Sequence, residues 1–564
     1  MRKGAMVAVL AGLVLPAAAD AALWQPLPDR AVAETAGRLR VAPVAFAAAR
    51  VAPVALTARR TVSLPTPAGG SARFRIFPSP VMEPGLAARH PEIRTFAGQG
   101  IDDPTATLRL SQTPLGLHAS VRSATGTWYV EPRFFGDARR HVSFDRRALP
   151  APWTRPPDEV LAGQDEGATA AAAAGPSAAP IVLRSYRLAL VTDQSYAQNS
   201  GALEGLPESA SEAERDARVT AAKAVLINRV NHVYEQDFAI RMLLVDATDR
   251  TNLNTAAEST GANGPCGPAP CFTASQVSSC SSAGLTQNSF VAGMLVGARN
   301  FDIAHLALGT DGGGIAQLGV VGDTAKARGC TGLARPVGDF YAIDYVAHEM
   351  GHQFGAHHTF NGVDGSCMAT NRNLDGSTAV EPGSGITVMA YAGICGTDDL
   401  QAHTDPYFSH ASMTQIAGYT GGAEQLRSSV QQVALRGFDG TDSLRLSYGA
   451  GTTGPIVRGT NYTAAGIKAE IEKLLPSGGT VTVTGLNGAA FGDTGFQATF
   501  GGAQANRAVG LLGLAELQGA TGVVGETVAG GATTRGGKTK TPTDNHAPVV
   551  SAPAEVAIPL RTPF

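Results

Sequence analysis

The sequence predicts an α/β (α+β) fold for its central part, between a mainly β N-terminal region and a small α+β C-terminal region. Three observations support this prediction. The chain has 564 residues, which is long enough for about three to four domains. Within residues 181–420, apolar runs typical of strands alternate with segments of helical periodicity. Outside this stretch, short apolar runs typical of strands predominate.

Residues 1–22 have the layout of a secretory signal peptide. Arg2 and Lys3 precede an apolar stretch over residues 5–15, and three alanines at 17–19 offer a cleavage site. A buried N-terminal helix is the alternative, but it does not explain why these three features occur together. We therefore expect a secreted or extracellular protein, free or attached to the cell surface.

Residues 23–162 predict a mainly β domain, with strand-like runs at 72–77 and 126–130. Residues 163–180 are rich in alanine and contain glycine and proline, so they offer little surface to bury. We interpret them as a linker that is exposed to proteolysis.

The central region, residues 181–420, contains the clearest alternation. Apolar runs predict strands at 186–191, 240–245 and 303–308, the last followed by a glycine-rich stretch at 309–314. Ser211 and Glu214 have the spacing of a capping box, which predicts the start of a helix. A second helix is expected near 290–296.

Residues 436–541 predict a small α+β domain. Strand-like runs at 444–448 and 480–483 flank a helical stretch at 464–475. Residues 545–564 resemble the first strand of a further β domain, which is expected to be truncated here.

The composition excludes some classes of partner. Lys and Arg number 44 against 47 Asp and Glu, so the net charge of -3 gives no general reason to expect nucleic acid or an anionic membrane as partner. No apolar run after the signal peptide approaches the roughly 18 residues of a membrane span.

Six cysteines lie within one stretch of the central region. An even number of cysteines in an exported chain predicts disulfides, and fifteen pairings remain open. Zinc is the competing use, but no Cys-x-x-Cys pair occurs. The candidates are Cys266, Cys271, Cys280, Cys330, Cys367 and Cys395.

A cluster of histidines indicates a metal site. His348 and His352 are four residues apart, so they lie on one helical face and their imidazoles can reach one ion. Gly355 can adopt a positive φ and turn the chain, which brings His358 in as a third nitrogen ligand. Three nitrogen ligands leave one position of tetrahedral zinc open for water, as in catalytic sites. Glu349 projects beside this face.

The surrounding residues support a helix with one core-facing side. Apolar residues recur at steps of three and four, so the two helical histidines and Glu349 are expected to face a cleft. A start is expected just after Pro336. The core-facing residues are Ile343, Val346, Ala347, Met350 and Phe354.

The pattern His-Glu-x-x-His-x-x-Gly-x-x-His, followed by a methionine turn at 386–391, resembles the metzincin zinc endopeptidases. Residues 344–347 and 381–385 resemble the bacterial reprolysin-like (adamalysin-like) branch, and the resemblance extends over about 184–419. It implies a mixed twisted sheet with an active-site helix. It also implies one catalytic Zn²⁺ held by three histidines, Glu349 as general base, and protein or peptide substrates.

Further residues take roles from the same resemblance. Met389 would form the hydrophobic floor beneath the metal. Tyr391 occupies a position where some metzincins carry a tyrosine that moves onto or off the metal, although in the reprolysin-like branch it is not a ligand. It is therefore a candidate for supporting a ligand or the transition state. Thr359 stands where reprolysins commonly have aspartate, so that anchor is in doubt.

The resemblance also predicts how substrates bind and how the enzyme is kept latent. The strand at 303–308 would be the edge of the cleft, to which an extended peptide adds by main-chain hydrogen bonds. Residues 23–162 resemble a propeptide in position. Since no cysteine precedes Cys266, a cysteine thiolate cannot block the zinc. Calcium binding and oligomeric state stay open.

Two other functions compete with this interpretation. One is a surface adhesion or binding protein with an inactive metzincin-like scaffold, and the other is a zinc hydrolase of another substrate class, such as an amidase. The complete set of three histidines, glutamate and methionine argues against a scaffold, which needs none of them together. The methionine turn favours protein substrates.

Overall fold

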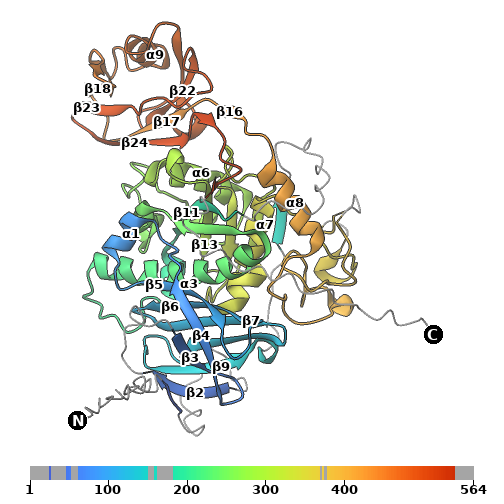
Figure 1. Cartoon of the computed structure of the whole chain (residues 1–564). Helices are drawn as coiled ribbons and strands as arrows, with labels where there is room; N and C mark the ends of the chain where they lie inside the picture. The colour runs from blue at the N-terminus through green and yellow to red at the C-terminus, as the bar shows by residue number, and fades with distance from the viewer. Residues whose placement is uncertain are drawn as a thin grey trace, which may run out of the picture.

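A computed structural model describes residues 24–26, 46–51, 61–149, 158–161, 182–368, 371–373 and 378–539. Three parts follow one another in space, with the N-terminal sheet and the C-terminal domain at opposite ends of the central part (Figure 1). The predicted signal peptide at 1–22, the linker at 163–180 and the final segment at 545–564 lie outside the described residues.

The N-terminal part is an antiparallel sheet of nine strands. Its strands pair in the order β1-β2-β9-β8-β7-β6-β5-β4-β3. Successive side chains point to opposite faces of the sheet, and one face is buried. In β4, for example, Phe74 and Ile76 are buried and the neighbouring arginines are exposed. The strands are β1 (Trp24–Pro26), β2 (Phe46–Val51), β3 (Thr61–Pro65), β4 (Ser71–Pro78), β5 (Arg94–Gly100), β6 (Thr107–Thr113), β7 (Gly116–Ser123), β8 (Gly126–Pro132) and β9 (Arg140–Asp145).

The central sheet is mixed and confirms the predicted α/β (α+β) class. Its order is β10-β14-β15-β13-β11-β12, and all neighbours are parallel except β14 and β15. A short strand, β26 (Lys538–Thr539), pairs with the start of β11. The strands are β10 (Asp158–Leu161), β11 (Arg184–Thr192), β12 (Ile240–Leu244), β13 (Ile303–Leu308), β14 (Gly313–Gln317) and β15 (Gly329–Gly332).

Helix α3 (Glu212–Phe238) joins the central sheet to the N-terminal sheet (Figure 1). It begins at the predicted capping box of Ser211 and Glu214. Its apolar face belongs to the central core, whereas Asn228 and His232 contact strands β6 and β7 through Ser111 and Ser120, at 2.9 and 2.8 Å. The interface between these two parts is therefore partly polar.

The C-terminal part has its own core and rests on helix α6 (Ser282–Leu295). A Cβ on Gly293 of α6 would lie 2.7 Å from Cα of Thr527, so glycine permits this close approach. Arg299 and Glu526 form an ion pair across the contact at 2.6 Å. The larger elements are β17 (Val430–Arg436), β18 (Ser443–Tyr448), α9 (Ala464–Glu472), β21 (Gly479–Gly485), β22 (Gly495–Gly502), β23 (Gly513–Gln518) and β24 (Thr521–Val528).

The central sheet includes strands from the flanking regions. It takes β10 from the N-terminal region and β26 from the C-terminal region, and strand β17 of the C-terminal part begins at Val430. Shorter elements complete the described fold: α1 (Pro84–Arg89), α2 (Gln194–Asn199), α4 (Ala256–Ser259), α5 (Ala274–Val277), α8 (His410–Gly421), β16 (Leu426–Arg427), β19 (Gly451–Thr452), β20 (Ile456–Val457) and β25 (Gly531–Ala532). Within the ranges given above, no helix combines the length and apolarity needed to cross a membrane.

The six cysteines form three disulfides, which confirms the prediction and settles the pairing. The bonds join Cys266 to Cys271, Cys280 to Cys330, and Cys367 to Cys395. The third bond lies next to the histidine cluster.

Candidate metal centre and active site

The active-site helix begins as a π-helix over Phe340–Ala347 (η6) and continues as α7 (His348–Gln353). The predicted core positions are all buried, from Ile343 to Phe354. The wider first turns were not predicted, because apolar periodicity over two turns does not distinguish an α-helix from a π-helix. Such segments are frequent at functional sites.

The three predicted ligands come together in the structure. Nε2 of His352 lies 3.1 Å from Nε2 of His348 and 3.1 Å from Nε2 of His358. All three rings are buried, and their ligand atoms lie within 4.8 Å of one another. Gly355 turns the chain with φ of +96°, as its position after α7 predicted.

The opposite nitrogen of each ring fixes the tautomer. Nδ1 of His348 lies 2.6 Å from the carbonyl oxygen of Val388, and Nδ1 of His352 lies 2.6 Å from that of Ala356. Nδ1 of His358 lies 2.5 Å from a third carbonyl oxygen, that of Asn371.

Carbonyl oxygens only accept hydrogen bonds, so each Nδ1 donates, and the tautomer that does so leaves the lone pair on Nε2. Three Nε2 lone pairs that converge in this way cannot hydrogen-bond to one another. They are the donor set that zinc prefers, and the carbonyls orient the rings as supports of a metal site do. The residues therefore fit a zinc ion.

The methionine turn packs under the helix. A Cβ on Gly351 would lie 2.4 Å from Sδ of Met389, so the two segments are in close contact. The backbone N–H of Thr359 donates to the Met389 carbonyl at 3.1 Å. Thr359 thus joins the methionine turn through its main chain.

Tyr391 is buried beside two of the ligands. Its ring centroid lies 4.6 Å from that of His358 and 5.9 Å from that of His348. Its ring also stacks on Phe360, with the centroids 4.4 Å apart. These contacts are ring-to-ring, so Tyr391 packs against two of the predicted ligands, and its role in supporting a ligand or the transition state stays a prediction.

Glu349 lies against the main chain of β14. A Cβ on Gly314 would lie 1.8 Å from Oε1 of Glu349, so only glycine leaves room for the carboxylate. The sequence singled out this glycine only as part of a glycine-rich stretch. Glycines of a strand often mark such close approaches.

The predicted edge strand was wrong. Strand β13, at Ile303–Leu308, lies inside the sheet between β15 and β11, and the strand beside Glu349 is β14. The glycine-rich stretch concealed this, because Gly313, with φ of +62°, starts a strand that returns antiparallel to β15.

Strand β10 covers the outer side of β14. The two strands are parallel, with Leu161 opposite Gln317, and the N–H of Leu318 donates to the Leu161 carbonyl at 3.0 Å. This pairing leaves no local signal in the sequence, because the four residues of β10 lie far from β14 in the chain.

Two buried residues anchor the helix from behind. The Tyr234 hydroxyl donates to the Ala347 carbonyl at 2.8 Å, and burial, followed by the charge of Glu349, raises the pKa of Tyr234 well above its ordinary value. His305 lies 2.9 Å from Oε1 of Gln353, and burial lowers its pKa to about 4, so it is neutral. Sequence reasoning missed both.

The match to a protein-family model agrees with this geometry. Residues 216–420 match the family model described as metallo-peptidase family M12B, reprolysin-like. Among solved structures, the chain is similar to metalloproteinase-II from Bacteroides fragilis, at 10% identity and a TM-score of 0.31, over 62% of this chain and 87% of that one. The chain has no significant match among curated proteins.

Proposed function

We propose that the chain is a secreted, zinc-dependent endopeptidase with Glu349 as general base, on the support of the match of residues 216–420 to the reprolysin-like M12B metallopeptidase model. One observation carries the proposal: three histidine Nε2 atoms converge, and the helix that carries two of these histidines also holds the buried carboxylate of Glu349 against strand β14. Export rests on residues 1–22 alone.

Each residue of the site has a distinct role in the proposed reaction. His348, His352 and His358 would hold the ion through Nε2. Zinc, when bound, lowers the pKa of water from about 15.7 toward 7 and polarises a carbonyl. Glu349 accepts the proton of the attacking water at its carboxylate and passes it to the leaving amine. The Glu349 side chain is fully buried, so its carboxylate is shielded from bulk water.

Strand β14 supplies the binding edge for an extended substrate. Main-chain N–H and C=O groups of a strand pair with any peptide, which suits protein substrates with modest sequence preference. This property separates the proposal from an amidase acting on small molecules. The adhesion alternative needs neither the oriented histidine rings nor the carboxylate.

The test is hydrolysis of an unfolded protein such as casein by the purified, processed chain. We expect cleavage that a zinc chelator abolishes and that one equivalent of Zn²⁺ restores, because the three Nε2 atoms form one site. A chain that binds one zinc yet cleaves neither casein nor varied peptides would favour the adhesion function.

We also propose that the chain is made as a zymogen, on the support of β10. This strand occupies the side of β14 that a substrate would use, and it precedes the predicted linker. Proteolysis within residues 163–180 would let β10 leave the edge.

Leu161→Pro is expected to raise casein hydrolysis by the uncleaved chain. The carbonyl of Leu161 faces β14, so in a parallel ladder its N–H faces β14 as well, and proline removes that donor. If β10 leaves the edge of β14 open in about 10% of the uncleaved molecules, then opening that edge in all of them raises the activity about tenfold. Leu161→Val keeps the N–H and should stay latent. Equal activity of both variants and the parent chain would refute this form of latency.

A further inference from the structure

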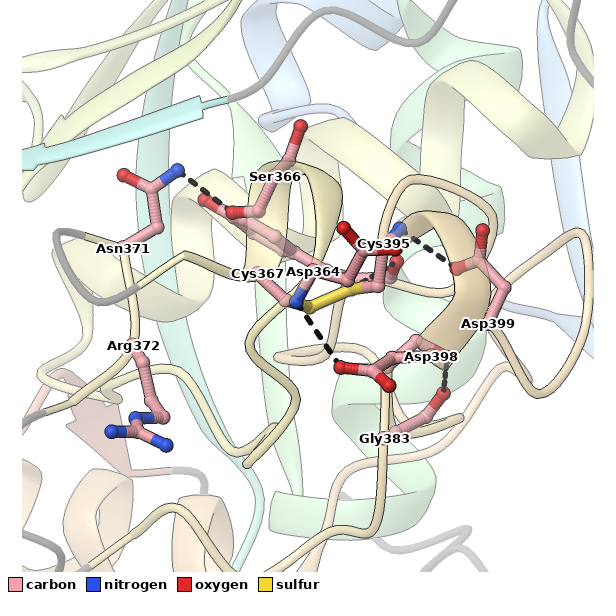
Figure 2. Close-up of a disulfide and its surroundings, with 12 residues drawn as sticks. Asp364, Ser366, Cys367, Asn371, Arg372, Gly383, Cys395, Asp398 and Asp399 are labelled. Atoms are coloured by element: carbon pink, nitrogen blue, oxygen red, sulfur yellow. Dashed lines mark hydrogen bonds between the residues drawn. A yellow bond between two sulfur atoms is a disulfide. The ribbon is translucent and has the colours of Figure 1, made fainter.

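The segment between the third histidine and the methionine turn is fastened by the Cys367–Cys395 disulfide. Figure 2 shows this bond with Ser366 and Asn371 on one side and Asp398 and Asp399 on the other. The bond closes a loop of the chain close to the metal centre: His358 precedes this loop, and Tyr391 lies within it, four residues before Cys395.

A continuous set of contacts runs from the disulfide to His358. The Ile394 carbonyl accepts from the N–H of Ser366 at 2.8 Å, next to both cysteines. The Ser366 carbonyl accepts from Nδ2 of Asn371 at 2.9 Å, as Figure 2 shows. The Asn371 carbonyl then accepts from Nδ1 of His358 at 2.5 Å.

The carbonyl that orients the third histidine lies in a different kind of segment from the other two acceptors. The acceptors for His348 and His352 lie in the methionine turn and directly after α7, at Val388 and Ala356. The acceptor for His358, the carbonyl of Asn371, lies in a turn and belongs to no helix or strand of the described residues.

The two cysteines of this disulfide also pack in the apolar cluster next to His358. Cys367 and Cys395 are fully buried and make one apolar cluster with Phe360 and Tyr391, the two rings that flank His358. Carboxylates tie the outer ends together, because Asp398 accepts from the N–H of Val363 at 2.7 Å. Loss of the disulfide would leave the Asn371 carbonyl without this fixed base.

We propose that Asn371 and the Cys367–Cys395 disulfide are positioning elements for His358: they hold the Asn371 carbonyl against Nδ1 and so keep Nε2 directed at the metal. The inference rests on the proposed zinc site. Supports of this kind typically change metal affinity by about 10–100-fold, so we expect zinc to leave the variants about 10–100-fold faster.

The experiment measures Zn²⁺ release from the loaded full chain to a coloured chelator. The variants are Asn371→Ala, Asn371→Asp, and the pair Cys367→Ser with Cys395→Ser. Asn371→Asp keeps the size of the side chain but cannot donate to Ser366, so it separates the hydrogen bond from packing. The control pair is Cys266→Ser with Cys271→Ser, a disulfide in another core cluster.

Two further measurements separate positioning from general support of the fold. Thermal unfolding of the metal-free chains should be nearly unchanged for both Asn371 variants, and the visible spectrum of the Co²⁺-loaded chains should change in them but not in the control pair. Release within twofold of the parent for both Asn371 variants, or equal acceleration by the control pair, would overturn the proposal. A parent chain that binds no zinc would instead overturn the proposed function. If the serine pair at 367 and 395 does not fold, the Asn371 variants still decide.

Discussion

Glu349→Gln is expected to lower kcat/KM for peptide hydrolysis by about 10²–10⁴-fold while one equivalent of zinc stays bound. General acid–base catalysis contributes about this factor, and glutamine keeps the shape of glutamate but cannot take up the proton of the attacking water. The histidine ligands are untouched, because each ring is oriented by a main-chain carbonyl. The measurement is casein or peptide cleavage together with metal analysis.

Two comparisons make this result specific. The exposed Glu208 provides a matched control, and Glu208→Gln should keep the activity of the parent chain. A Glu349→Gln variant with zinc bound and turnover within tenfold of the parent would assign the proton transfer to another group.

The ligand set could be predicted because its information is local. His348, His352 and His358 lie within eleven positions, and helix geometry with one glycine turn is enough to bring them together. The same holds for α3, whose start is defined by Ser211 and Glu214, and for β13, whose six residues are all buried.

Other features of the site could not be predicted, because they depend on contacts that the type of residue at a position does not reveal. The acceptors that orient the rings are carbonyls, which every residue carries, so the role of Asn371 leaves no mark in the sequence. The pairing of β10 with β14 joins segments more than 150 positions apart. A glycine-rich stretch also hid the strand that lies beside Glu349, because Gly314 makes room for the Glu349 carboxylate and does not serve flexibility alone.

Arg146→Met is expected to lower the free energy of unfolding by about 3–5 kcal/mol, the usual cost of removing one partner from a buried ion pair. Arg146 follows strand β9, in a short 3₁₀ turn (η3, Arg146–Ala148), and is itself buried. Its guanidinium contacts Asp344 at 2.9 Å, Asp339, and the Thr404 carbonyl. Methionine fills similar space but leaves two carboxylates in the interior without this cation.

The measurement is urea unfolding of the full chain, with Arg147→Met as control. Arg147 is the next residue in the same turn and is exposed, so its replacement should change stability by less than about 0.5 kcal/mol. Asp339 and Asp344 stand at the start of and within the π-helix that leads into His348. Equal stability of the two variants would mean that the N-terminal sheet only covers this helix. A large difference would mean that it also stabilises the approach to the metal centre.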